Sequence, residues 1–244
     1  ASPELNKNKI FSKKIKHNFK DFYNSYFIKR KKNFPLIDAK IAVSKEFKTI
    51  NKKSKWITNC RSRKVGHLIR SRYDSIISTS KSINKDNSLL NCRIDGLKKY
   101  SPDIIIIDIN LKIKKNLKIF NLEKKRKIYL FTSKYNKNKF DFLKRKKVKI
   151  ISIKSLYTKN EFIYLFKKIS QFGKSRILVE AGLTFMSSLI KFKLINNLFL
   201  FKSNKKLGNK GYNNIKYNIF KNFKLKEKVK VNLYEDELYH IKVK

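Results

Sequence analysis

Residues Arg176–Ser188 read RILVEAGLTFMSS, which is the pattern of a short apolar strand, a glycine turn and a helix. The apolar run ends at the carboxylate of Glu180, and hydroxyl side chains lie in the first turns after Gly182. Ligands of open α/β sheets bind at the carboxyl ends of the strands, so Glu180 is expected to lie in a cleft. The N–H groups at a helix N-terminus attract anions, and Gly182 would let a phosphate approach them. An ordinary strand–turn–helix with a capping Glu180 explains the same residues equally well.

The same alternation of apolar runs with amphipathic segments extends over most of the chain after Pro35. It is typical of an α/β fold with a largely parallel sheet. We expect strands at Leu36–Val43, Ser75–Ser78, Asp103–Ile109, Ile128–Thr132, Val148–Ile153, Arg176–Glu180, Leu198–Lys202, Val229–Tyr234 and Glu237–Val243. We expect helices at Arg61–Arg72, Lys137–Lys144, Glu161–Phe172 and Leu183–Phe192, and a loop at Lys202–Asn222. The last strands have no helix between them, which favours antiparallel pairing at one edge of the sheet.

The first 34 residues have a different character, because they are polar, rich in Lys and only weakly periodic. Phe19, Phe22, Tyr23 and Tyr26 are at roughly helical spacing, which predicts a helix leading into the domain. We therefore divide the chain into a helical or linker segment, 1–34, and one domain, 35–244. The chain begins at Ala1 rather than Met, as a fragment of a longer protein would.

The charge is strongly unbalanced, with 62 Lys and Arg against 17 Asp and Glu and a net charge of +45. Such an excess is typical of proteins that bind polyanions, so a non-specific nucleic-acid-binding α/β protein is one hypothesis. However, only nine of the 62 are Arg, and Gly (6) and Pro (3) are scarce. Lys, Asn, Ile, Phe and Tyr are the residues of A/T-rich codons. We therefore favour base composition as the source of the charge, and we expect no specific nucleic-acid partner.

Cysteine content and hydropathy exclude several classes of protein. Cys60 and Cys92 form no C-x-x-C pair, which argues against a disulfide framework or structural zinc and favours a cytoplasmic protein. No apolar run approaches the ~18 residues that span a bilayer, which argues against a membrane protein.

Two further segments carry residues suited to ligand binding. Lys40, Ala42 and Ser44 share one face of an expected strand, and Trp56 lies between Ser54 and Thr58 just before an expected helix. A lone Trp is more often a core residue than a platform for a cofactor.

Arginine is informative in a chain that otherwise uses Lys. Arg70 lies in the expected helix Arg61–Arg72, and Arg93 ends the run Asp86–Arg93. Arginine presents a planar fork that suits a phosphate, although a solvated surface position explains each residue as well.

Taken in order, these motifs resemble the reductase domain of the bifunctional riboflavin-biosynthesis deaminase/reductase. The resemblance covers about residues 34–243 and rests on Lys40–Ser44, Ser54–Thr58, Arg70, Asp86–Arg93, Val179–Gly182 and Leu207–Gly211. Residues 22–34 resemble the segment that joins the two domains of that family.

The resemblance implies a dihydrofolate-reductase-like fold, with a mixed, mostly parallel sheet flanked by helices and an antiparallel C-terminal edge. It implies a homodimer that reduces 5-amino-6-(5-phosphoribosylamino)uracil with NADPH, by hydride transfer to ribose C1′ of the ring-opened imine. The dinucleotide would contact Ala42, Trp56, Ser82, Asp86, Gly182, Leu183, Thr184, Phe185, Met186, Ser187 and Ser188. The substrate would contact Ser54, Arg70, Leu90, Arg93 and Glu180, and the catalytic residues would be Glu180 and Lys40.

The chain departs from the family pattern at several positions. It has Ser44-Lys45-Glu46-Phe47 where the family usually has Ser-x-Asp-Gly, Ser88 where Pro is common and Ser82 where Thr is common. A catalytically degenerate reductase is therefore a further alternative.

The zinc motifs of the deaminase, H-x-E and P-C-x-x-C, are not found in this sequence. We therefore expect no deaminase activity in this chain. The deaminase would be fused upstream or be a separate protein. We assign no role to the three histidines.

Overall fold

The structure is a computed structural model that describes residues 20–121, 126–215, 219–223, 225 and 228–243. Its strands are β1 (Leu36–Val43), β2 (Ile50–Asn51), β3 (Ser75–Thr79), β4 (Asp103–Ile107), β5 (Ile128–Thr132), β6 (Val148–Ser152), β7 (Arg176–Val179), β8 (Asn197–Lys202), β9 (Gly211–Tyr212) and β10 (Glu237–Lys242). Its α-helices are α1 (Lys20–Lys32), α2 (Cys60–Arg70), α3 (Ser80–Asp86), α4 (Lys137–Arg145), α5 (Lys159–Gln171) and α6 (Leu183–Lys191). Short 3-10 turns lie at Lys98–Tyr100, Lys118–Asn121, Gly208–Lys210 and Ile219–Asn222.

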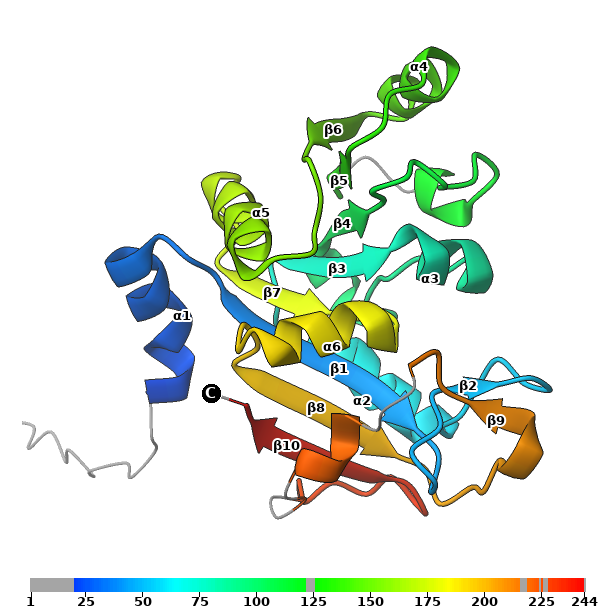
Figure 1. Ribbon diagram of the computed structural model, residues 1–244. Coiled ribbons are helices and arrows are strands. Elements are labelled where there is room, and N and C mark those ends of the chain that lie inside the picture. The colour runs from blue at the N-terminus through cyan, green and yellow to red at the C-terminus, as the bar shows by residue number, and fades with distance from the viewer. Residues whose placement is uncertain (1–19, 122–125, 216–218, 224, 226–227, 244) are drawn as a thin grey trace, which may run out of the picture.

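Eight strands form one twisted sheet in the order β10-β8-β1-β7-β3-β4-β5-β6 (Figure 1). The strands from β8 to β6 are parallel to their neighbours, and β10 pairs antiparallel with β8. The predicted fold class, a mostly parallel mixed sheet with an antiparallel C-terminal edge, is confirmed.

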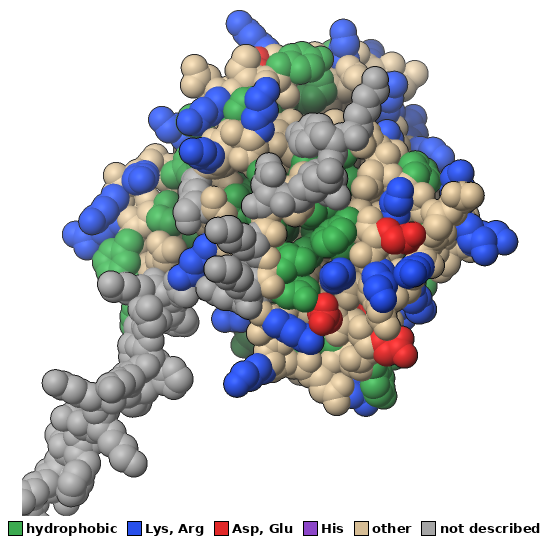
Figure 2. All heavy atoms as spheres, turned by 60° about the horizontal axis from the view of Figure 1, so that its bottom comes forward, with side chains coloured by type: hydrophobic (Ala, Val, Ile, Leu, Met, Phe, Trp, Pro, Cys, Tyr) green, Lys and Arg blue, Asp and Glu red, His purple; other side chains and the backbone are tan. Residues whose placement is uncertain are grey.

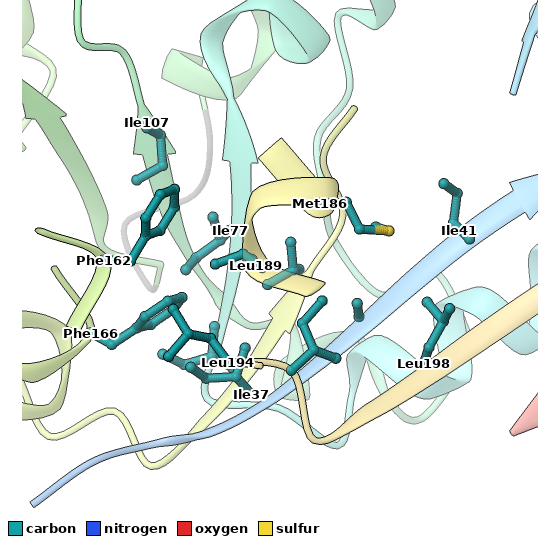
Figure 3. Close-up of a cluster of buried hydrophobic side chains, with 14 of the residues drawn as sticks. Ile37, Ile41, Ile77, Ile107, Phe162, Phe166, Met186, Leu189, Leu194 and Leu198 are labelled. Atoms are coloured by element: carbon teal, nitrogen blue, oxygen red, sulfur yellow. The ribbon is translucent and has the colours of Figure 1, made fainter. Parts of the chain in front are cut away.

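Helices cover both faces of this sheet. The apolar side chains of α5 and α6 pack on one face, and Figure 3 shows Met186 and Leu189 of α6 and Phe162 and Phe166 of α5 among them. The helices α2, α3 and α4 contribute to a second apolar cluster on the other face.

Strand alternation decides which residues reach the site. Every second residue of β1, from Ile37 to Val43, packs in the α5–α6 cluster. Lys40 therefore points to the opposite face, where its Cε lies 3.7 Å from the position of a Cβ on Gly66 of α2. Glu180 follows Val179, which packs in the α5–α6 cluster, so its side chain faces α2 as well.

The predicted strand at Val229–Tyr234 is wrong. That segment is irregular, and only the bridge Lys228↔Tyr239 lies beside it. The carbonyl of Leu233 instead accepts a hydrogen bond from the Asn59 side chain, and Asp236 accepts from the Asn59 N–H and the Ser62 hydroxyl. The polar groups of this turn hold the N-terminus of α2 rather than a neighbouring strand.

Helix α3 and the strand pair β2–β9 were not predicted. Helix α3 follows β3 directly, with Thr79 as its N-cap. The expected loop at Lys202–Asn222 contains β9, which pairs antiparallel with β2. The helix predicted from the N-terminal aromatic residues is present as α1, although Phe19 lies outside the described residues. The division of the chain at residue 34 stays a prediction.

The turn after β1 forms although Phe47 stands at the position where glycine is usual. Phe47 has φ +61°, its N–H donates to the Ser44 carbonyl, and its ring stacks on Phe220. Positive φ recurs at other described residues that are not glycine, including Lys147 and Lys193 just after α4 and α6. This left-handed region disfavours side chains that carry a Cβ.

Gly211 explains part of the Leu207–Gly211 motif. A Cβ at Gly211 would lie 2.6 Å from the Cβ of Leu207 and 3.1 Å from that of Lys48. The close approach of these segments at the β2–β9 ribbon therefore requires glycine.

Candidate functional site

Glu180 lies at the centre of a buried charged cluster at the carboxyl end of β7. Its carboxylate accepts two hydrogen bonds from Arg70, Nε to Oε1 at 2.7 Å and Nη2 to Oε2 at 2.9 Å. The ammonium of Lys40 lies 3.9 Å from Oε2. The exposed fractions of the three side chains are only 10%, 14% and 20% for Glu180, Arg70 and Lys40. The cluster thus brings together three residues predicted from separate motifs.

The backbone of Glu180 is fixed as firmly as its side chain. Its N–H donates to the Ile77 carbonyl of β3 at 2.9 Å, and its carbonyl accepts from the Ser78 hydroxyl at 2.7 Å. Glu180 is therefore held by β3 through its backbone and by α2 through its carboxylate, which limits its movement.

The electrostatics of the cluster keep Glu180 ionised. Burial alone would raise its pKa, but the positive charges of Arg70 and Lys40 outweigh burial and bring the pKa to about 2. Burial lowers the pKa of Lys40, and Glu180 opposes that shift. The site therefore holds a fixed carboxylate beside an ammonium that gives up its proton more readily than an exposed lysine does.

Arg93 lies at the outer end of this cluster, connected to it through His67. The Nε and Nη2 atoms of Arg93 lie 3.1 and 2.9 Å from Nε2 of His67, and Arg93 is exposed. Nη1 of Arg70 donates to the carbonyl of Asn91 at 3.0 Å. Arg70 has five N–H donors, and three of them are already used by Glu180 and Asn91.

The helix N-terminus predicted to bind phosphate lies beside the same strand end. Helix α6 begins after the exposed Gly182, which has no side chain to cap the first N–H groups. A Cβ at Gly182 would lie 3.7 Å from the hydroxyl of Ser82, which also lies 3.1 Å from the Thr79 hydroxyl. The start of α6 therefore has no side-chain cap and lies beside the hydroxyl group of Ser82, a combination that suits a phosphate.

Trp56 is a surface residue rather than a core residue, with 48% of it exposed. Lys55 and Arg63 lie over its ring, and Ser54 bonds its backbone. The Lys55 ammonium also donates to the carbonyl of Asp86 at 2.5 Å, so the Trp56 loop contacts the end of α3. Burial raises the pKa of the Asp86 carboxyl.

Several predicted contact residues have side chains that face the core. Leu183, Met186 and Leu90 are buried in the apolar clusters, and Ala42 packs partly against one of them. Their side chains stabilise the fold, so a ligand would reach Leu183 and Met186 through the backbone. Thr184 is exposed and accessible, and the remaining predicted residues of α6 are Phe185, Ser187 and Ser188.

Sequence reasoning missed two residues that build the site. His67 was given no role, although it lies one helical turn before Arg70, which was a signal that the two share a face. Arg126 donates to the carbonyls of Pro102, Leu89 and Leu90 and so holds the loop that carries Arg93. No local pattern around Arg126 indicates this contact.

Other kinds of site receive no support within the described residues. No group of three His, Cys, Asp or Glu side chains there could hold a metal ion. None of the helices described is long and apolar enough to cross a bilayer. On the face shown in Figure 2, Lys and Arg side chains are scattered rather than gathered in one stripe.

Comparison with known proteins gives a consistent result. A model of the RibD C-terminal domain matches residues 37–235. The chain is 31% identical over 199 residues to the riboflavin biosynthesis protein RibD of Buchnera aphidicola subsp. Baizongia pistaciae, covering 75% of this chain and 52% of that protein. The chain spans about half the length of the curated relatives it matches.

Solved structures share the fold. RibD of Acinetobacter baumannii superposes with a TM-score of 0.74 at 19% identity, over 91% of this chain and 62% of that one. A diaminohydroxyphosphoribosylaminopyrimidine deaminase/5-amino-6-(5-phosphoribosylamino)uracil reductase of Thermotoga maritima gives 0.71 at 20% identity, over 91% and 60%.

Proposed function

Since this chain belongs to the RibD C-terminal domain family, we propose that it is an NADPH-dependent reductase of riboflavin biosynthesis. Its substrate would be 5-amino-6-(5-phosphoribosylamino)uracil, and its product the ribitylamino compound. The observation that carries the proposal is the buried Glu180 carboxylate, which Arg70 and Lys40 hold ionised beside the open helix end at Gly182.

The residues around Gly182 fit a dinucleotide. The uncapped N–H groups of α6 and the hydroxyl of Ser82 suit the pyrophosphate. The exposed ring of Trp56 offers a flat apolar surface, and Ala42 and Asp86 stay predicted contacts of the dinucleotide. A bound nicotinamide supplies the hydride.

Lys40 and Glu180 are the catalytic residues of the proposal. When the ribose ring opens, the bond between C1′ and the ring oxygen breaks, and the oxygen takes a proton, which we assign to the Lys40 ammonium. An iminium cation then remains at C1′, and the Glu180 carboxylate stabilises it. Hydride addition to C1′ neutralises that cation and gives the ribityl amine. Lys40 recovers its proton from solvent.

The 5-phosphate of the substrate is assigned to Arg93. Arg93 is exposed and uses only one side of its guanidinium on His67. Ser54, Leu90 and Arg70 stay predicted substrate contacts, although Arg70 acts mainly by holding Glu180.

The partners of the chain are part of the same proposal. We expect a cytoplasmic homodimer, and a deaminase, fused or separate, that supplies the substrate. The length of the relatives and the double name of the Thermotoga maritima protein support a fused deaminase.

The decisive experiment is an NADPH-oxidation assay with the deaminated pyrimidine substrate. We expect oxidation that depends on substrate, with kcat/KM at least about tenfold higher for NADPH than for NADH. Lys40→Met should lower kcat by about tenfold or more. Arg93→Ala should raise KM by about tenfold to a hundredfold, because a charge-assisted pair is lost.

The matched control is Lys98→Met, which removes a surface ammonium paired with Asp95 and should change neither constant. A folded chain without substrate-dependent oxidation would instead be a degenerate reductase. Equal efficiency with both cofactors would contradict the NADPH assignment.

A further inference from the structure

His67 is buried between the two arginines assigned to the site. Its Nδ1 lies 2.8 Å from the carbonyl oxygen of Asn91, and its Nε2 lies within 3.1 Å of both Nε and Nη2 of Arg93. His67 is 8% exposed, and it lies on α2 one turn before Arg70.

These contacts determine which ring nitrogen carries the proton. A carbonyl oxygen can only accept a hydrogen bond, so Nδ1 must donate to Asn91. A guanidinium can only donate, so Nε2 must accept from Arg93 with its lone pair. Nη1 of Arg70 also lies 3.3 Å from Nδ1, but it has the carbonyl of Asn91 as a nearer acceptor at 3.0 Å. The neutral ring with its proton on Nδ1 therefore satisfies both Asn91 and Arg93.

We propose that His67 is a positioning residue, which fixes the guanidinium of Arg93 so that its opposite edge faces the phosphate of the substrate. Arg93 donates its Nε hydrogen and one Nη2 hydrogen to the imidazole ring, and its Nη1 hydrogens point away from the ring. An arginine on an exposed loop would otherwise sample many rotamers, and ordering it in advance lowers the entropy lost on binding. The inference rests on the proposed role of Arg93.

The charges around the ring favour this neutral state. Arg70 from α2 and Arg93 from the loop after α3 both oppose a positive charge on the ring, and Glu180 after β7 partly offsets them. Burial and the two arginines bring the pKa of His67 to about 4, although the Asn91 carbonyl opposes the shift. A protonated ring would lose its acceptor and repel Arg93, so His67 holds Arg93 throughout the neutral range.

The test measures binding of ribose 5-phosphate by calorimetry, which needs no reductase activity. His67→Phe keeps the ring but removes the acceptor, and it should weaken binding by about tenfold. His67→Gln restores a side-chain oxygen acceptor and should bind within about threefold of the original chain. In an Arg93→Ala background, His67→Phe should have no further effect, because both act through the same contact.

Two controls separate positioning from folding. His240→Phe replaces another histidine, which lies in β10 and stacks on Phe199 of β8, and it should leave binding unchanged. If His67→Phe does not fold, His67→Leu takes its place, and its melting temperature is measured alongside.

The same assay distinguishes failure of this inference from failure of the proposed function. Weakened binding with no rescue by Gln, or an equal loss in the Arg93→Ala background, would overturn the positioning role. If the original chain binds ribose 5-phosphate no more tightly than the Arg93→Ala variant does, the positioning role is overturned as well. If ribose 5-phosphate binds as expected but NADPH is not oxidised with the pyrimidine substrate, the reductase proposal fails and His67 keeps its role.

Discussion

Glu180→Gln is the substitution whose effect the structure defines best. It keeps the shape of the side chain but removes the only negative charge between Arg70 and Lys40 within the described cluster. Both cations are largely buried, so water compensates little for the lost negative charge. Removing one partner of a buried ion pair costs about 3–5 kcal/mol.

The pKa of Glu180 gives an independent magnitude. It falls from its ordinary 4.5 to about 2, and each unit corresponds to about 1.4 kcal/mol in favour of the charged form. The two routes agree on about 3 kcal/mol. In a chain of this size, 1 kcal/mol shifts the melting temperature by about 2–4 °C, so the variant should melt about 6–12 °C lower.

Urea denaturation of a double-mutant cycle at pH 7 measures the pair itself. Arg70→Gln should also destabilise, because it leaves Glu180 with only the more distant Lys40. The double variant should be more stable than the sum of the two losses predicts, with a coupling of about 2 kcal/mol or more.

The matched control is Asp95→Asn, which breaks an ion pair whose side chains are 69% and 94% exposed. It should leave the free energy of unfolding unchanged, because solvent screens an exposed pair. If Glu180→Gln costs no more than this control, or if the two single losses simply add, the cluster is effectively solvated. Glu180 would then not be a fixed, ionised carboxylate in the site.

Further predictions concern the rest of the fold. Asp236→Ala should cost about 1–2 kcal/mol in thermal denaturation, because the Asn59 N–H and the Ser62 hydroxyl at the start of α2 lose their acceptor. Gly211→Ala should cost about 1–3 kcal/mol and speed proteolysis near β9, because its Cβ has no room. The free energy of unfolding should fall with acidification. The folded chain depresses the pKa of His67 from 6.5 to about 4 and that of Glu180 from 4.5 to about 2. Stability is therefore lost between about pH 6.5 and 4 through His67, and between about pH 4.5 and 2 through Glu180. Urea titrations at several pH values test this, and a stability that is constant down to pH ~4 would contradict the assignment of His67. Binding to duplex DNA should collapse by about 0.2 M salt in a filter-binding assay, and sequence-specific binding retained at that salt would favour the nucleic-acid hypothesis.

The strands of the central sheet were predictable because their apolar runs are continuous and short. Helix α3 was not, because its sequence is polar and buries little beyond Ile83. Its start is specified by the Thr79 cap and by the end of β3, which are tertiary context. The pair β2–β9 has two residues in each strand, too few for any periodicity.

The residue types of the site could be predicted, but their pairing could not. Motif order identifies Lys40, Arg70 and Glu180 as members of one site. It does not show that Arg70 directs its fork at Glu180, because α2 and the end of β7 are 110 residues apart in the chain. For the same reason, the contact of His67 with Arg93 depends on the path of the loop that Arg126 holds.

The residues of this fold that have a positive φ without being glycine link the base composition of the gene to the stability of the protein. Glycine is the usual residue just after a helix C-terminus, and Lys147 and Lys193 occupy that position after α4 and α6. A residue with a Cβ costs about 1–2 kcal/mol there, and the same cost recurs at Phe47 and Leu90. Such costs are a sizeable part of the 5–15 kcal/mol that keeps a typical domain folded. A genome that drifts away from glycine codons thus raises the fraction of unfolded molecules, and with it the demand on chaperones and proteases.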